Sequence, residues 1–314
     1  MNARELSPAL RHLAQQGIYL GTSSWKYPGW LGQLYSPARY EYRGKVAKCR
    51  FEKNCLEEYA EVFPSVCVDA SFYRFPGAKY LQDLAEQVPK DFRFSHKATD
   101  TITIKHFPRQ RRHGEYAGKA NPCFLDANLF LQSFLKPLEP YREQTGIIMF
   151  EFSRFYQRDF EHGRDFLAAL DAFLAELPTE QWDFGVEIRN PEFLKKPYFE
   201  TLARHRVGHV YNQWQRMPSL AEQITLQNPD REITPIASRL LLKSGRNYES
   251  AVESFEPYDR IQEPQLEVRS AASNLIRKLS EKPKGRRSFL YVNNRLEGNA
   301  LSTIAAILAL LALD

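Results

Sequence analysis

Eight short apolar runs of strand length recur along this chain, and helical stretches lie between them. The alternation of strands and helices predicts a parallel sheet covered by helices, and eight such units predict a closed (β/α)8 barrel of the TIM type. A doubly wound open sheet is the alternative, but it usually carries fewer strands, and no GxGxxG follows the first run. We expect strands at 18–21, 65–71, 92–97, 146–152, 184–189, 209–211, 239–243 and 288–293, and helices at 53–63, 159–177, 194–205, 265–279 and 299–313.

The length of 314 residues fits one such barrel, since barrels of about 250 residues or more form single domains. We expect the barrel over residues 18–314. An extension of residues 1–17 precedes it, with a helix over 6–16 that covers the barrel floor. Hydrophobic residues make up 43% of the chain and charged residues 26%, which excludes a largely disordered protein. Residues 100–122 and 218–235 are expected to form long loops.

The cellular setting follows from the cysteines and the two ends of the chain. Four cysteines, at positions 49, 55, 67 and 123, form no CxxC pair, so neither a zinc ribbon nor a redox motif is predicted. The first residues lack the apolar run of a signal peptide, and the apolar run at the end is too short to span a bilayer. We therefore expect a cytoplasmic protein without a membrane partner. The net charge of +5 permits an acidic partner without requiring one.

The fifth expected strand carries the strongest candidate site. The chemistry of such barrels lies at the carboxyl ends of the strands. If Val186 and Ile188 face the helices, strand alternation points Glu187 and Arg189 into the barrel mouth. We interpret Glu187 as a general acid or base and Arg189 as a holder of negative charge. A structural ion pair that braces the rim is the alternative.

Other expected strands also end in polar side chains. These are Asp69, Lys97, Glu151 and Lys243, which together predict a polar mouth that carries charges of both signs. The eighth strand ends in Asn293 and Asn294, just before a helix start near Asn299. Amides beside a helix N-terminus predict an anion site, and the alternative is that Asn299 only caps the helix.

A metal site is not predicted. Asp69, Glu151, Glu187 and His209 come from different strands, as metal ligands in barrels do, but no local ligand motif such as HExxH occurs. We interpret His209 as a structural histidine. The cofactor is left open.

Residues 105–119 form a basic segment with seven Lys, Arg or His residues among fifteen. Arg109, Arg111 and Arg112 lie close together there, with Phe107 and Tyr116 between or near them. Such a segment is able to grip a nucleic-acid backbone. A solvated basic loop is the alternative.

Five motifs occur in order over nearly the whole chain: GTSSWKYPGW (Gly21–Trp30), SFYRFP (Ser71–Pro76), FRFSHKAT (Phe92–Thr99), GVEIRNPEF (Gly185–Phe193) and YVNNRLEGNA (Tyr291–Ala300). Together they resemble the YecE-like family, known as domain of unknown function 72. The resemblance implies a TIM-type barrel and leaves the activity open. It adds Trp25 and Tyr73 to the candidate binding residues, beside Lys97, Glu187, Arg189, Asn293 and Asn294.

The chain also departs from the family pattern, which suggests a divergent member. The family shows vEiN where this chain has VCVD (Val66–Asp69), and fLfQlPp where it has MFEFSR (Met149–Arg154), with Glu151 for Gln and both prolines lost. The vRlHG stretch becomes LLKSG (Leu241–Gly245), with neither Arg nor His in place.

Three functional hypotheses follow. The first is an enzyme, with hydrolysis among the open reactions, that acts on a polar anionic small molecule with Glu187 and Lys97 as its catalytic residues. The second is a nucleic-acid-binding or phosphodiester-acting protein that uses Arg109, Arg111 and Arg112. The third is a ligand-binding barrel without catalysis, consistent with the departures from the family pattern.

Overall fold

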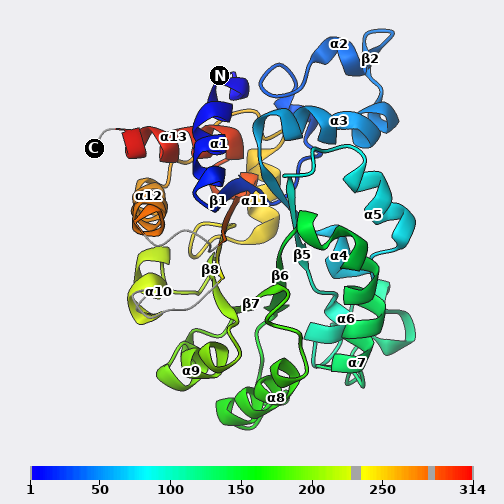
Figure 1. Ribbon diagram of the computed structural model, residues 1–314, viewed down its shortest axis with the longest axis vertical. Helices are drawn as coiled ribbons and strands as arrows, with labels where there is room; N and C mark the ends of the chain where they lie inside the picture. Colours follow the sequence, from blue (N-terminus) through cyan, green and yellow to red (C-terminus); the bar gives the residue numbers. More distant parts are fainter. Residues whose placement is uncertain (1, 228–234, 282–286, 313–314) are drawn as a thin grey trace.

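Eight parallel strands close into a barrel at the centre of the molecule (Figure 1). The computed structural model describes residues 2–227, 235–281 and 287–312. Around the barrel the strand order is β1-β10-β9-β8-β7-β6-β5-β4, so strands that follow one another along the chain are neighbours in space. The barrel strands are β1 (Ile18–Thr22), β4 (Ser65–Val68), β5 (Arg93–Lys97), β6 (Thr145–Phe152), β7 (Asp183–Ile188), β8 (Gly208–Gln213), β9 (Ile236–Leu240) and β10 (Ser288–Val292). A small hairpin of β2 (Glu41–Tyr42) and β3 (Lys45–Val46) lies outside the barrel.

Helices surround the barrel and connect its strands (Figure 1). The chain begins with η1 (Ala3–Leu6) and α1 (Ser7–Gln15), and η1 contacts the last helix, α13 (Ala300–Ala312). The main covering helices are α3 (Lys48–Val62), α5 (Ala78–Ala85), α8 (Gly163–Ala175), α9 (Lys196–Arg204), α10 (Leu220–Gln227) and α12 (Leu266–Ser280), and α7 (Ala127–Phe130), η4 (Leu131–Leu135) and η5 (Lys136–Gln144) follow one another between β5 and β6. Shorter elements are η2 (Pro28–Trp30), α2 (Pro37–Tyr40), α4 (Ala70–Tyr73), α6 (Asp100–Thr103), η3 (Arg111–Tyr116), η6 (Pro191–Phe193), α11 (Tyr248–Phe255) and η7 (Asn294–Leu296).

The barrel prediction is confirmed, and seven of the eight strands begin within one residue of their expected start. The exception is β9, which spans Ile236–Leu240 rather than 239–243. The apolar run continues past the strand, where Leu241 and Leu242 pack against Phe255 and Tyr258. The expected loop at 100–122 contains α6 and η3, and the one at 218–235 contains α10, while residues 228–234 lie outside the described residues.

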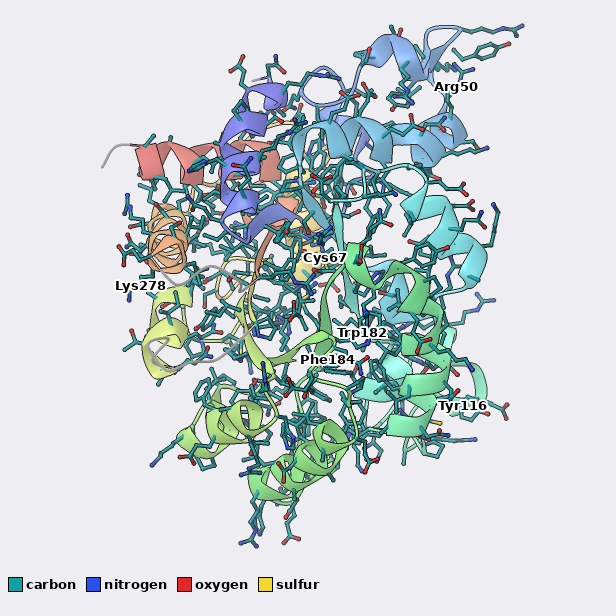
Figure 2. All side chains as sticks on the ribbon, viewed as in Figure 1. Arg50, Cys67, Tyr116, Trp182, Phe184 and Lys278 are labelled. Carbon is teal, nitrogen blue, oxygen red and sulfur yellow. The ribbon has the colours of Figure 1, made fainter. Side chains whose placement is uncertain are left out.

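Alternation along the strands separates the inside of the barrel from its outer surface. On β7, Val186 and Ile188 pack among the apolar side chains under the helices, as expected. The interior is filled by a compact set of mostly apolar side chains, so it is a core and not a pore. This set comprises Cys67, Ile147, Met149, Val210, Ala237, Phe289 and Tyr291 (Cys67 is labelled in Figure 2). Gly185 fits this layer because a Cβ there would lie 2.8 Å from both Ile147 and Val210.

A layer of hydroxyl groups lies next to this apolar layer. The Tyr291 hydroxyl lies 2.6 Å from Ser65 Oγ and 2.5 Å from Ser95 Oγ, so three strands share one buried network. Because all strands are parallel, the next inward-facing positions toward their carboxyl ends form the mouth. On β4, β5 and β10 these positions are Asp69, Lys97 and Asn293.

Within the described parts of the chain, the helices are all too short or too polar to cross a membrane.

Candidate functional site

Six charged side chains gather at the carboxyl ends of the barrel strands. We call them the charged cluster; they are Asp69, Lys97, Glu151, Glu187, Arg189 and Arg239. They come from β4, β5, β6, β7 and β9 or from the residue directly after the strand. Three carboxylates thus face three cations, so the cluster as a whole is electrically balanced.

Arg239 and Glu187 form the deepest part of the charged cluster. Arg239 Nη1 donates to Glu187 Oε2 at 2.6 Å and to Glu151 Oε2 at 2.5 Å. Arg189 Nη2 lies 2.5 Å from the other oxygen of Glu187. The side chain of Glu187 is 0% exposed and that of Arg239 is 3% exposed, so neither is open to solvent. Two guanidinium groups therefore enclose one buried carboxylate, and this leaves Glu187 no surface on which to touch a ligand.

Lys97 and Glu151 form the outer part. Lys97 Nζ lies 3.0 Å from Glu151 Oε2, 3.7 Å from Asp69 Oδ1 and 3.9 Å from the centre of the Phe72 ring. Burial works against the ammonium charge of Lys97, yet Glu151 and Asp69 outweigh it and raise the pKa of Lys97. Both groups of the pair are therefore charged at neutral pH.

The same balance governs Glu151. Burial opposes its ionisation, but Lys97, Arg189 and Arg239 outweigh burial and hold its pKa well below the usual range. Its side chain is 14% exposed, so unlike Glu187 it keeps an edge toward the mouth.

A pocket of about 380 Å³ opens over this edge. Its walls are Glu151, Ser153, Arg154, Tyr156, Arg189, Trp214, Gln215, Arg216 and Met217, from the ends of β6, β7 and β8 and the loops after them. The Arg189 guanidinium lies 4.3 Å from the centre of the Trp214 ring. Three arginines thus face a single carboxylate. We call this hollow the mouth pocket.

The structure brings five of the expected site residues together. Asp69, Lys97, Glu151, Glu187 and Arg189 are joined by ion pairs of 2.5 to 3.7 Å, directly or through Arg239. The expectation that Glu187 and Arg189 point inward therefore agrees with the geometry, and so does the mixture of charge signs.

Asn293 and Asn294 directly follow β10, and their side chains accept hydrogen bonds from backbone amides that come soon after them in the chain. Asn293 Oδ1 accepts from the Arg295 amide at 2.9 Å, and Asn294 Oδ1 accepts from the Ala300 amide at 2.7 Å. Asn299 Oδ1 accepts from the Ser302 amide at 2.8 Å. Asn294 and Asn299 thus both bond amides in the first turn of α13, which agrees with the capping alternative for Asn299.

Three other expected residues lie apart from the charged cluster. Trp25 is buried in the outer core, and Tyr73 is an exposed residue at the end of α4 whose ring lies under the Arg112 guanidinium. Lys243 was expected at the end of the seventh strand. It lies three residues beyond β9 instead, pairs with Glu263, and is not among the walls of the mouth pocket.

The difference between the predicted and observed bounds of β9 also explains why Arg239 was not predicted as a site residue. With β9 at Ile236–Leu240, alternation turns Ala237 and Arg239 inward. The absence of an arginine from Leu241–Gly245 therefore does not deprive the mouth of one, because the same strand supplies Arg239. Arg154, Trp214 and Arg216 were also missed. They lie in loops, where the sequence has no strand or helix periodicity from which to predict which side chains come into contact.

The basic segment 105–119 is a folded loop. The Phe107 amide donates to the Lys119 carbonyl, and the Gly118 amide donates to the Phe107 carbonyl, both at 2.9 Å. Arg112 is engaged, since its Nη1 donates to Asp100 Oδ2 at 2.6 Å. Arg111 is exposed, and Arg109 lies along Gly118. The three arginines are therefore not equivalent.

His209 lies on the outer side of the barrel wall. Its Nδ1 is 2.9 Å from the Tyr198 hydroxyl, and its ring packs edge-on against Tyr198, Phe199 and Tyr211. Burial lowers its pKa to about 4, so the ring is neutral. These contacts fit a structural histidine. Among the described residues no group of three His, Cys, Asp or Glu side chains is arranged to hold a metal ion.

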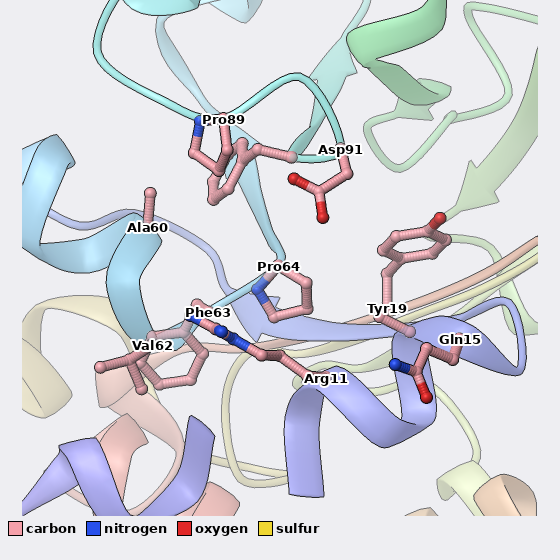
Figure 3. Close-up of a pocket in the computed structure, with 11 residues that line it drawn as sticks. Arg11, Gln15, Tyr19, Ala60, Val62, Phe63, Pro64, Pro89 and Asp91 are labelled. Carbon is pink, nitrogen blue, oxygen red and sulfur yellow. The ribbon is translucent and has the colours of Figure 1, made fainter. Parts of the chain in front are cut away.

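A second hollow, of about 490 Å³, lies at the opposite end of the barrel (Figure 3). Arg11, Tyr19, Pro64 and Asp91 are among its walls, and they lie at or before the starts of β1, β4 and β5. The helix α1 contributes Arg11 and Gln15 to it, which places this helix at the barrel floor. Because barrel chemistry lies at the carboxyl ends of strands, the mouth pocket is the candidate site.

Comparisons with known proteins agree with the architecture. A family described as "Protein of unknown function DUF72" matches residues 19–314. The Escherichia coli protein YecE is 26% identical over 179 residues, which is 57% of this chain, and the chain spans about half (51%) of its length. A DUF72 family protein from Enterococcus faecalis superposes with a TM-score of 0.60 at 15% identity, covering 95% of this chain and 96% of that one. One from Thermotoga maritima gives 0.58 at 16% identity, covering 95% and 99%. At such identities the solved structures establish the fold alone.

Proposed function

The chain belongs to the DUF72 family, and on that premise we propose that it binds a small anionic molecule in the mouth pocket and acts on it there. The observation that carries this proposal is the set of three arginines, Arg154, Arg189 and Arg216, around a pocket with one carboxylate. Among the described residues, Arg154 and Arg216 have no acidic partner. Cations gathered in a concave site raise the local concentration of an anionic ligand.

Arg189 is prepared to bind such a ligand. Glu187 and Glu151 engage its Nη2, while its buried Nη1 has no hydrogen-bond partner in the described part of the chain. An unpaired buried donor carries a free-energy penalty, which a ligand oxygen would remove if the Arg189 side chain turned this nitrogen toward the pocket on binding. Trp214, on the face of the guanidinium, gives the pocket an apolar wall.

The proposed chemistry uses Lys97 and Glu151. Glu151, kept ionised, lines the pocket and accepts a proton from the ligand. Lys97 is not a wall of the pocket; kept protonated 3.0 Å behind Glu151, it stabilises the developing negative charge through its electric field. Glu187 was expected to be the acid or base, but it is fully buried between Arg189 and Arg239. In this proposal Glu187 is a positioning residue that fixes the two guanidinium groups.

A binding protein without turnover is the second candidate. It is favoured by one observation: every charge in the charged cluster is compensated, and the pKa of Glu151 is far below neutrality. General-base catalysis is most efficient when the pKa of the base lies near the working pH. The two candidates share the ligand class and differ only in whether product forms.

Calorimetric titration with inorganic phosphate tests the binding step. Arg216→Ala is expected to weaken phosphate binding about tenfold, since a charge-assisted hydrogen bond contributes about 1.5 to 3 kcal/mol. Arg50→Ala is the control, because Arg50 is an exposed cation on α3, outside the walls of the mouth pocket (Figure 2). Equal weakening in both variants would contradict a specific site.

Mass spectrometry separates the two candidates. Extracts of small molecules are incubated with the wild-type protein and with Lys97→Met, after circular dichroism has confirmed that the variant folds. Loss of an anionic compound only with the wild type supports an enzyme. Retention of the compound on the protein without loss supports the binding candidate.

A further inference from the structure

The mouth pocket adjoins a third hollow of about 390 Å³, which we call the side pocket. The two pockets share Ser153, Arg154 and Tyr156 among their walls. All three belong to the segment that directly follows β6.

The side pocket is strongly cationic. Lys105, Arg109, Arg154 and Arg158 line it, together with His106 and the single carboxylate of Asp159. That carboxylate is already engaged, since Oδ1 lies 2.6 Å from His106 Nδ1 and Oδ2 accepts from the Tyr156 amide at 2.7 Å. Lys105 Nζ lies over the rings of Phe124 and Phe160, at 4.9 and 5.3 Å, rather than beside an acid. Taken together, the two pockets present six Lys or Arg side chains against two carboxylates.

The loop that carries Lys105 and Arg109 is held in place before any ligand arrives. His106 forms an isolated bridge with Ala120, and hydrogen bonds between Phe107 and the 118–119 segment close the loop. Arg112 ties the loop to α6 through Asp100. A site formed by an ordered loop loses less conformational entropy on binding than one formed by a mobile loop.

We propose that the ligand carries two separated phosphate groups or equivalent dianions, one bound in the mouth pocket and the other in the side pocket. The part of the ligand that joins the two groups passes Arg154, which lines both pockets. This proposal deepens the proposed function and rests on it. Phosphate is favoured over carboxylate because its additional oxygens and charge match the number of donors, which include the Ser153 hydroxyl as well as the cations. When one end is bound, the other binds as if at high local concentration, so two weak sites give one tight one.

The test compares linear alkane bisphosphates with alkyl monophosphates of the same chain length by calorimetry. We expect that, at the best chain length, the bisphosphate binds at least tenfold more tightly than the monophosphate. Arg109→Ala should remove most of that gain and leave monophosphate affinity within about twofold. Arg111→Ala is the matched control, because Arg111 lies in the same loop, is exposed, and lines neither pocket.

The outcomes are distinguishable. If the monophosphate binds but no bisphosphate binds more tightly, the two-pocket proposal is overturned and the proposed function stands. If neither binds, both fail. If Arg109→Ala and Arg111→Ala weaken the bisphosphate equally, the attraction is diffuse and the side pocket is not a subsite. The same titration is carried out with a single-stranded oligothymidylate. If this polymer binds more tightly than every bisphosphate, the cations form a nucleic-acid-binding surface and the small-molecule proposal is overturned.

Discussion

Arg239 Nη1 lies 2.6 Å from Glu187 Oε2 at the base of the mouth, and the two side chains belong to strands separated in the barrel by β8. Neither is open to solvent, and Arg189 contacts the same carboxylate from the other side. The pair therefore connects the buried barrel interior to the residues that line the mouth pocket.

Removing one partner of this pair should destabilise the fold. Glu187→Gln leaves two buried guanidinium groups short of a counter-charge and is expected to cost about 3 kcal/mol of unfolding free energy. Arg239→Met alone should cost a similar amount. The double variant should cost clearly less than the sum, because it removes the pair as a unit. Urea unfolding of the four proteins measures this, and strictly additive losses would show that the pair is not coupled.

Stability should fall as the pH drops below neutrality. Burial lowers the pKa of His96 from 6.5 to about 4, so the folded chain excludes a proton that the unfolded chain accepts. The contribution of His96 is therefore complete above pH 6.5 and is lost as the pH falls toward 4. For this residue we expect a loss of about 2 kcal/mol between about pH 7 and pH 5. His96→Leu should lose correspondingly less over that interval in urea unfolding, and an unchanged pH dependence would refute this assignment.

A separate loss is expected at lower pH. The three cations hold the pKa of Glu151 below its usual value, so its contribution to stability is present above about pH 4.5 and is lost as the pH falls further. The histidine and carboxylate steps should therefore appear in different pH intervals.

The last helix should be part of the core. Leu301 on α13 is 0% exposed, and Leu301→Ala is expected to cost about 3 kcal/mol through the lost contacts and the cavity left behind. Leu266→Ala makes the same chemical change at a side chain that is 69% exposed, and it should change the unfolding free energy by less than about 0.5 kcal/mol. Similar losses in the two variants would mean that α13 is an appendage.

Arg112 should act on the loop rather than on a ligand. Its ion pair with Asp100 connects the basic loop to α6, so Arg112→Ala is expected to speed amide hydrogen exchange over residues 105–119. Arg111→Ala should leave exchange unchanged. Equal exchange in both variants would indicate that the loop is held by its backbone hydrogen bonds alone.

The fold was largely predictable from the sequence because strand and helix periods are local signals. Alternation alone turned Glu187 and Arg189 inward, and both lie in the charged cluster. Arg239 was not predicted as a site residue, because the three leucines at 240–242 indicate the middle of a strand and so place Arg239 at its start. In the structure Leu241 and Leu242 pack beyond the end of the strand, which places Arg239 near its carboxyl end. Arg154 meets Trp214 and Arg216 only in the folded chain, since it follows β6 whereas they follow β8, all in loops without a periodic pattern.

The fluorescence of Trp214 offers the most direct test of anion binding in the mouth pocket, because its ring lies on the Arg189 guanidinium at the pocket wall. Titration with inorganic phosphate should give a saturable change in emission that is absent from Trp214→Phe. In Arg216→Ala the same change should require about tenfold more phosphate. An equal change in Trp214→Phe, or no saturable change in the wild type, would contradict the proposal that the barrel mouth is an anion site.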